Sequence, residues 1–324
     1  MQHRRTLLAA GCAAAWWAGP ASAQAWPDRP LRLIVPYPPG GAVDLAGRLI
    51  AEGLRDRLGQ PVVVENRAGA GGNIGVAATA KAAPDGTTLC TTAVNSLAIN
   101  QFVYDKLPFD PERDLIPVSL GWEAPLVLVV PAAHVPARSV QEFAAWAKAQ
   151  RGGLAYGSSG IGTTVHLSGA LLCRRLGIEG THVPFRGGSE ALTALLRGDT
   201  QFSVDNLPTV LAAVRDGALR ALAVTSASRW PDLPEVPTLA EAGIPDFVVT
   251  SWGAVSVPAG TPRPIVERLS EAMRSAAADP ALQARFAPTG NRPLGTTPEE
   301  AAARAAKERP MWREAVRISG ARLE

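Results

Sequence analysis

The sequence predicts an α/β protein with a mixed, mostly parallel sheet, and two observations support this prediction. Short apolar runs typical of strands alternate with helical patterns along nearly the whole chain after residue 25. Turns containing glycine or proline separate them, as expected of βαβ units. The 324 residues are enough for two domains that each bury a core.

The first half of the chain alternates as follows. Strands are predicted over residues 31–35, 61–65, 87–94 and 126–130. Helices are predicted over 42–58, after the glycine-rich loop 68–75, and from a capping box formed by Ser139 and Glu142.

The second half repeats the alternation and then becomes mainly helical. Strands are predicted over 154–156, 182–185, 202–205 and 219–224. Helices are predicted over 163–176, 189–196 and 209–215. Helices dominate after residue 262, and the string TTPE at 296–299 begins a long C-terminal helix.

The N-terminus has the three parts of an export signal. Arg4 and Arg5 form a positive start, residues 6–17 an apolar stretch, and Ala-Ser-Ala at 21–23 a cleavage site. The apolar stretch is shorter than the ~20 residues of a membrane-spanning helix. We therefore expect residues 1–23 to be a signal peptide, with the general and the twin-arginine export routes both open.

Composition and charge exclude several classes of protein. Hydrophobic residues make up 47% and charged residues 19%, which is typical of a globular chain. The 32 basic and 29 acidic residues nearly balance, and no concentrated basic stripe indicates nucleic acid. Cys90 and Cys173 remain after the leader, and buried free thiols are favoured over a bridge, which stays open.

The sequence lacks the common catalytic and metal-binding motifs. It has no Walker loop, H-E-x-x-H, paired C-x-x-C or G-x-S-x-G string. No two histidines outside the leader have metal-ligand spacing on one helix. The string at 157–162 superficially matches a dinucleotide loop, but it lies mid-chain and no Y-x-x-x-K pair follows it. We expect no enzyme, no cofactor and no metal.

Two glycine-rich turns lie between a predicted strand and a predicted helix, PPGG at 38–41 and GSSGIGTT at 157–164. Unpaired N–H groups and the positive dipole end of a helix favour an anion there, and glycine lets it approach closely. Serine and threonine in the second turn add hydroxyl donors. We expect a carboxylate held by hydrogen bonds between the two turns, although turns also need glycine for backbone geometry alone.

Other candidate ligand residues follow further predicted strands. Asn95 and Ser96 follow the third strand, and Asp205 ends a later one at the same face. Arg186 could pair with a distal carboxylate, although a solvated loop arginine is an equally good interpretation. Asp44 can equally cap its own helix. His166 is more simply a packed helix residue than a ligand.

Six strings recur in one order over most of the mature chain: RPLRLIVPYPPGGAVDLAGR, GQPVVVENRAGAGGNIG, APDGTTL, YGSSGIGTTVHLSGALL, HVPFRGG and LRALAVTSASRWPDLPEVPTLAEAG. In these strings the protein resembles the Bug (TctC-like) family of periplasmic solute-binding proteins, which is associated with tripartite tricarboxylate transport. The resemblance implies a type II periplasmic-binding-protein-like fold with two α/β domains and two hinge strands. It places domain 1 at residues 24–124 and 251–324 and domain 2 at 125–250, with hinge strands expected at 126–130 and 249–257.

The resemblance also implies which residues bind the ligand. The family's first-domain loop falls on Tyr37, Gly40, Gly41 and Asp44. Its second-domain loop falls on Ser158, Ser159, Gly162, Thr163 and Thr164, with His166 just behind. Together with Asn95, Ser96, Arg186 and Asp205, these residues form the predicted site, in which ordered waters often take part.

The expected function is that of a periplasmic solute-binding protein. It captures a small organic carboxylate between its domains and delivers it to the membrane permease subunits of a tripartite tricarboxylate transporter. A monomer is favoured, and no nucleic-acid partner is expected. An exported enzyme or sensor subunit of the same fold, and an amino-acid-binding protein, are the alternatives. Mono-, di- and tricarboxylates, aromatic acids and acidic amino acids all stay open as ligands.

Overall fold

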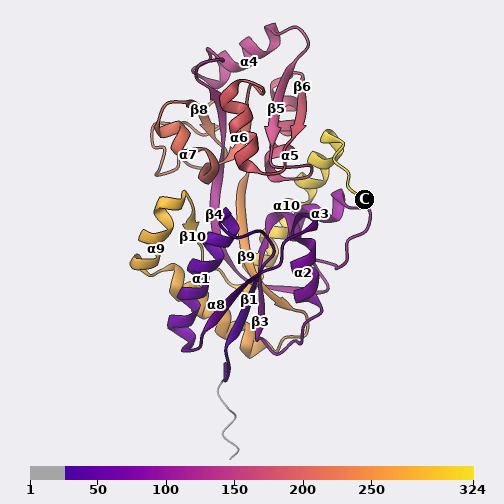
Figure 1. Ribbon diagram of the computed structural model, residues 1–324, viewed down its shortest axis with the longest axis vertical. Helices are drawn as coiled ribbons and strands as arrows, with labels where there is room; N and C mark the ends of the chain where they lie inside the picture. The colour runs from indigo at the N-terminus through magenta and orange to yellow at the C-terminus, as the bar shows by residue number, and fades with distance from the viewer. Residues whose placement is uncertain (1–25) are drawn as a thin grey trace, which may run out of the picture.

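The computed structural model describes residues 26–324, which form a lower and an upper part along one long axis (Figure 1). The predicted signal peptide, residues 1–23, lies outside the described residues. Within residues 26–324, no helix is both long and apolar enough to cross a membrane. Cys90 and Cys173 are both buried and unbridged, as the free-thiol interpretation predicts.

The lower part contains a sheet with the strand order β10-β4-β9-β3-β1-β2. Its strands are β1 (Leu31–Val35), β2 (Val62–Asn66), β3 (Thr88–Ala93), β4 (Leu115–Pro131), β9 (Thr250–Pro258) and β10 (Arg292–Pro293). β1 pairs in parallel with β2 and β3, whereas β9 runs antiparallel to β3 and to β4. The carboxyl ends of β1 and β3 therefore point the same way.

The upper part contains β5 (Leu154–Ser158), β6 (Gly180–Pro184), β7 (Ser203–Asn206) and β8 (Leu219–Val224). β5 and β6 are parallel, and a bridge between Tyr156 and Phe202 joins β5 to the chain entering β7. β7 and β8 both pair antiparallel with the second half of β4.

Two strands connect the parts. β4 pairs with β9 as far as Pro125 and with β7 and β8 from Leu126 or Val127 onward. β9 begins at Thr250, opposite Pro125. The domain boundaries predicted at 124/125 and 250/251 lie beside this change of pairing partners.

The α/β class with a mixed sheet is confirmed, but parallel pairing covers less of it than the alternation of elements predicts. Parallel pairs are β1–β2, β1–β3 and β5–β6, whereas β4 and β9 are antiparallel to their partners. The physical reason is that β4 ascends into the upper part and β9 returns from it, so the two connecting strands run in opposite directions.

The lower helices are α1 (Ala42–Leu58), α2 (Asn73–Ala80), α3 (Asn100–Val103), α8 (Arg263–Ala277), α9 (Pro280–Phe286) and α10 (Pro298–Ser319), with short helices η1 (Ala70–Gly72), η2 (Asn95–Ile99, a π-helix) and η3 (Ala287–Thr289). The upper helices are α4 (Val140–Ala149), α5 (Thr164–Leu176), α6 (Gly188–Arg197) and α7 (Leu207–Arg215). Ser139 caps α4 by accepting from Glu142 N, but the predicted capping box is incomplete, because Glu142 Oε2 accepts from Arg138 N and not from Ser139 N. Thr297 with Glu300 forms a full capping box for α10.

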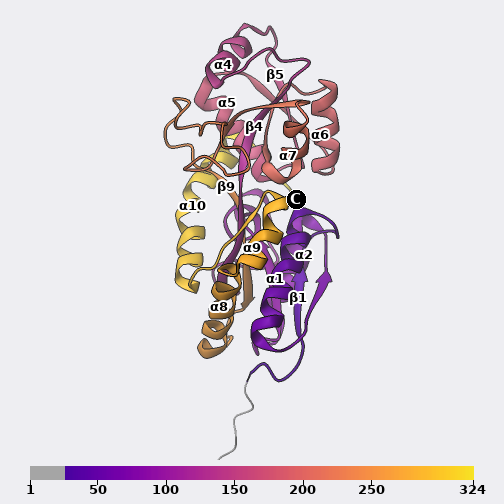
Figure 2. The same cartoon turned by 90° about the vertical axis from the view of Figure 1, so that its left-hand side faces the viewer.

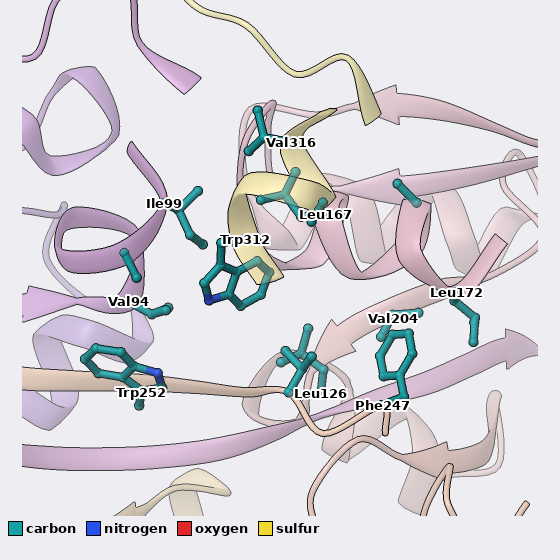
Figure 3. Close-up of a cluster of buried hydrophobic side chains, with 14 of the residues drawn as sticks. Val94, Ile99, Leu126, Leu167, Leu172, Val204, Phe247, Trp252, Trp312 and Val316 are labelled. Atoms are coloured by element: carbon teal, nitrogen blue, oxygen red, sulfur yellow. The ribbon is translucent and has the colours of Figure 1, made fainter. Parts of the chain in front are cut away.

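Helix α10 joins the two parts on one side of the connecting strands. It contacts η2 and β4, and it also contacts α5 of the upper part. In Figure 2 it runs beside β9 on the side opposite α6 and α7. One hydrophobic core includes Trp252 of β9, Trp312 of α10 and Leu126 of β4, which lie near one another in Figure 3. This core is continuous from the lower part to the upper part.

Candidate functional site

The first glycine-rich loop leads from β1 into α1, and Asp44 fixes its shape. The Asp44 carboxylate is 2% exposed. It accepts hydrogen bonds from Gly40 N at 2.9 Å, Arg48 Nε at 2.9 Å and Asn66 Nδ2 at 2.8 Å. Burial opposes its charge, but these hydrogen bonds outweigh burial and hold the pKa of Asp44 below its usual value. Asp44 therefore holds the loop in shape. Because the N–H of Gly40 donates to Asp44, it is not free to bind a ligand.

The N–H groups at the start of α1 are the anion donors that this loop offers. Gly41 is the N-cap of α1, is exposed, and has an extended backbone with φ −78°. The first-turn N–H groups have no carbonyl partner within their helix. They therefore remain available to a ligand, together with the positive end of the helix dipole.

Tyr37 forms a wall beside the first loop. Its carbonyl accepts a hydrogen bond from Asn66 Nδ2 at 3.0 Å, and its hydroxyl lies 3.5 Å from the carbonyl oxygen of Gly71. A Cβ on Gly72 would approach the Tyr37 ring to 3.2 Å. The glycine-rich stretch of residues 69–72 thus lets the backbone pass close to this ring.

The second glycine-rich loop leads from β5 into α5, and two of its hydroxyls are used internally. Thr163 Oγ1 caps α5 by accepting from His166 N at 3.3 Å and donates to Gly160 O at 2.8 Å. Ser158 Oγ lies 2.6 Å from His182 Nε2 and accepts from Gly160 N at 3.1 Å. Ser158 and Thr163 therefore shape the loop, contrary to the expectation that their hydroxyls are free donors.

Two histidines support the second loop from behind. His166 Nδ1 accepts a hydrogen bond from Gly162 N at 3.1 Å. The His166 ring stacks on His182 with centroids 3.6 Å apart. Burial lowers the pKa of both to about 4, and for His166 the neighbouring His182 adds to the shift. Both rings are neutral at pH 7, so each has one donor and one acceptor nitrogen. His166 Nδ1 is the acceptor that holds Gly162 N, and His182 Nε2 shares a hydrogen bond with the Ser158 hydroxyl, which also donates to Gly160 O at 3.0 Å.

Ser159 and Thr164 are the remaining hydroxyl donors of the second loop. Thr164 is the first residue of α5 and is 4% exposed, and Ser159 is half-buried. Neither hydroxyl is engaged by another group within the described part of the chain. They and the N–H groups of Thr164 and Val165 are the donors that this loop offers to an anion, because the N–H of His166 is capped by Thr163.

The two parts meet at Gly162. Asn95 Nδ2, at the start of η2, donates a hydrogen bond to Gly162 O at 3.1 Å. A Cβ on Gly162 would lie 2.7 Å from the Val103 side chain of α3. Ser96, next to Asn95, is 1% exposed, and its Oγ has no hydrogen-bond partner among the described residues. The π-helix η2, which follows β3, therefore contacts the second loop directly through Asn95. The Ser96 hydroxyl, one residue further on, has no hydrogen-bond partner among the described residues.

Asp205 and Arg186 differ in their surroundings. The Asp205 carboxyl is 3% exposed and accepts from Asn206 N at 2.8 Å and Ser203 Oγ at 3.2 Å. Burial raises the pKa of Asp205 to about 6 despite these hydrogen bonds. Arg186 is exposed, and its backbone N–H donates to Glu190 Oε2 at 3.2 Å. Asp205 is thus a buried group at the carboxyl end of β7, and Arg186 is a surface residue.

Sequence reasoning missed Asn66, His182 and Val103 as parts of this site. Asn66 ends β2 and His182 lies in β6, so each is brought to its loop by strand pairing. Val103 follows a π-helix that no pattern predicts. Among the described residues, no group of three or more His, Cys, Asp or Glu side chains could hold a metal ion.

Gly162→Ala is expected to destabilise the fold by about 1–2 kcal/mol as well as to disturb the site. Gly162 has φ +74°, and an added Cβ would clash with Val103. Urea unfolding checks this value. Gly187→Ala is the matched control, because Gly187 has φ −179° and open space around its Cα. Equal stability of the two variants would contradict the role of Gly162 in packing.

Comparison with known proteins decides the family. The family model described as "Tripartite tricarboxylate transporter family receptor" (TctC) matches residues 46–316. The chain belongs to this family. The resemblance stated from the sequence strings is thereby confirmed, and the protein is a solute-binding receptor of the TctC type.

Individual relatives of this TctC-family receptor agree. Protein BugT of Bordetella pertussis is 40% identical over 327 residues, covering all of both chains. The structure of R. palustris Rpa4515 with adipate has a TM-score of 0.83 at 35% identity, covering 92% of this chain and 100% of that one. MatC from Rhodopseudomonas palustris with bound malate has a TM-score of 0.77 at 32% identity, covering 90% and 100%.

Proposed function

We propose that this TctC-family receptor binds a small dicarboxylate between the starts of α1 and α5. The observation that carries the proposal is that Asn95 and Val103 of the lower part contact Gly162 in the loop before α5. The first-turn N–H groups of α1, the uncapped N–H groups of Thr164 and Val165 in α5, and the hydroxyls of Ser159 and Thr164 supply neutral donors.

Neutral donors suit a carboxylate that must be released again. Hydrogen bonds from backbone N–H groups fix its position without the strong charge pairing of an arginine clamp. His166 and His182 are neutral, so the second loop adds no positive side chain of its own. The relatives that carry adipate and malate favour a dicarboxylate among the ligands left open by the sequence.

Binding would couple to closure of the two parts. We take residues 24–124 and 251–324 as one domain and 125–250 as the other, with β4 and β9 as the hinge strands. A ligand that contacts both loops only in the closed form stabilises that form. The closed form is then the signal that membrane permease subunits of a tripartite tricarboxylate transporter recognise.

The place of action follows from the N-terminal sequence and the family. A positive start, an apolar stretch and an Ala-Ser-Ala cleavage site within residues 1–23 fit a signal peptide. We propose that the mature receptor works in the periplasm as a monomer and without catalytic turnover.

Thermal unfolding of the purified mature chain with adipate, malate, citrate, aspartate and glutamate tests this function. A ligand at 100 times its Kd adds ~2.7 kcal/mol of stability, so we expect a clear rise in Tm with at least one dicarboxylate. Proton NMR of the same mixtures should show the carboxylate unchanged. No Tm shift with any of the five acids, or a product signal, would contradict the proposal. A response to the amino acids alone would favour an amino-acid-binding protein.

A further inference from the structure

We propose that Arg309 of α10 is a positioning residue for the ligand loops. It would hold the π-helix η2, and through Asn95 it would hold the loop that contains Gly162. The geometric part of this inference stands on contacts in the protein itself. Its consequence for ligand affinity rests on the proposed function.

Arg309 reaches η2 from the other end of the chain. Its Nε donates a hydrogen bond to the carbonyl oxygen of Leu97 at 3.2 Å. Its Nη1 forms an ion pair with Glu112 Oε1 at 2.9 Å. The Arg309 side chain is 15% exposed, whereas Glu112 is 61% exposed. The contact with Leu97 is thus the more shielded of the two, and a charged donor on a carbonyl makes a comparatively strong hydrogen bond.

The hydrogen bonds continue from η2 to the second loop. Asn95 lies two residues before Leu97 in η2 and donates to Gly162 O at 3.1 Å. Gly162 N in turn donates to His166 Nδ1 at 3.1 Å. π-Helices are rare and often occur at functional sites, where their backbone is less regular than an α-helix. The Arg309 guanidinium, bound to the carbonyl of Leu97, can therefore stabilise the irregular backbone of η2.

Helix α10 is anchored to its neighbours at the residue before Arg309, although Pro310, the residue after it, interrupts the hydrogen bonds of the helix. The neighbouring Glu308 accepts hydrogen bonds from Trp252 Nε1 at 2.9 Å and Trp312 Nε1 at 3.1 Å. Both indole rings are fully buried. In the view of Figure 3, Trp252 lies near Val94 and Trp312 lies near Ile99. α10 is therefore fastened to the connecting strand β9 at the residue next to Arg309.

Hydrogen–deuterium exchange of the unliganded full mature chain tests the proposal without any ligand. Arg309→Met keeps the aliphatic stem and removes the donors. We expect exchange about tenfold faster at residues 95–100 and also at 160–164, as loss of a charge-assisted hydrogen bond predicts. Arg317→Met on the same helix is the control, because Arg317 is 67% exposed and pairs with Glu314. It should leave both segments unchanged.

Further variants distinguish positioning of the loop that contains Gly162 from a general loosening of α10. Glu112→Gln removes the exposed partner of Arg309 and leaves the Leu97 contact, so exchange at 160–164 should stay as in the wild type. Asn95→Ala breaks the link to Gly162. Adding Arg309→Met to Asn95→Ala should then change exchange at 160–164 by less than about twofold, since the two substitutions act through one connection.

Arg309→Lys retains a hydrogen-bond donor and should restore part of the protection from exchange at these residues.

Three results would overturn the proposal. They are unchanged exchange at 160–164 in Arg309→Met, an equal effect of Glu112→Gln, and a full effect of Arg309→Met in the Asn95→Ala background. Adipate and malate titrations of the same variants give the functional readout, with about tenfold weaker binding expected for Arg309→Met. Altered exchange in a receptor that binds none of the five acids named above would contradict the proposed function and still support the positioning role.

Discussion

Gly41→Leu is expected to abolish carboxylate binding while leaving the Tm within about 2 °C of the wild type. Gly41 is the N-cap of α1 with φ −78°, which any L-residue adopts. A Cβ there would meet only Pro38 O, at 3.7 Å. A side chain at the N-cap lies over the N–H groups of the first turn, which is how serine or aspartate caps a helix. Leucine covers the same groups without accepting from them.

The measurement is the rise in Tm caused by adipate or malate, whichever the wild type binds. For wild type it corresponds to ~2.7 kcal/mol at 100 times the Kd, and for Gly41→Leu we expect no rise. Ala302→Leu adds an apolar side chain at an exposed position of α10 and serves as the control. A wild-type response in Gly41→Leu would show that the ligand does not use the start of α1.

Glu123→Gln is expected to lower the free energy of unfolding by about 2 kcal/mol. Glu123 is 7% exposed and accepts from Arg292 Nε at 2.8 Å and Arg304 Nη1 at 3.0 Å. Removing its charge leaves Arg292 without its carboxylate partner, whereas Arg304 keeps its ion pair with Glu308 at 3.1 Å. The effect stays below that of a fully buried pair because Arg292 is 55% exposed and its charge is screened by solvent.

The same substitution changes the dependence of stability on pH. Burial opposes the charge on Glu123, but the hydrogen bond from Arg292 and the charge of Arg304 outweigh it and hold the pKa below its ordinary 4.5. A lowered pKa gives stability that is present above the unfolded value and is lost as the pH falls through the folded value. The difference between wild type and Glu123→Gln should therefore be full at pH 7 and shrink below about pH 4.

Urea unfolding at pH 7 and at pH 3 measures both effects. Glu267→Gln is the matched control, since Glu267 pairs with Arg263 on the surface and is 58% exposed. We expect it to change stability by less than about 0.5 kcal/mol. An equal loss in the two variants at pH 7, or a Glu123→Gln effect that does not change with pH, would contradict the role assigned to the Glu123 cluster.

Local patterns predicted most elements of the fold within a few residues. The α1 helix and the strands β1 and β8 have the predicted bounds. The first half of β4 was missed, because Pro117, Gly121 and Pro125 read as breakers. In the structure, register shifts in the pairing with β9 accommodate this stretch. A neighbouring strand, and not local propensity, makes it a strand.

The two loops were also predictable, but the state of their donors was not. The pairing of Ser158 with His182 joins residues 24 apart and depends on the pairing of β5 with β6. The contact of Asn95 with Gly162 spans 67 residues and depends on how the two parts meet. Patterns of period 2 or 3.6 describe one element at a time, so they carry no information on such contacts.

The sequence alone determined most of the alternating strands and helices and the two glycine-rich loops, because backbone preference and side-chain periodicity are local properties. The six matching strings indicated the family. The tertiary structure decided which loop donors stay free for a ligand and which brace the loop. It also decided that Arg309 reaches Leu97 across 212 residues. These outcomes depend on pairing and packing between distant segments, and each buried hydrogen-bonding group takes the partner that the fold brings to it.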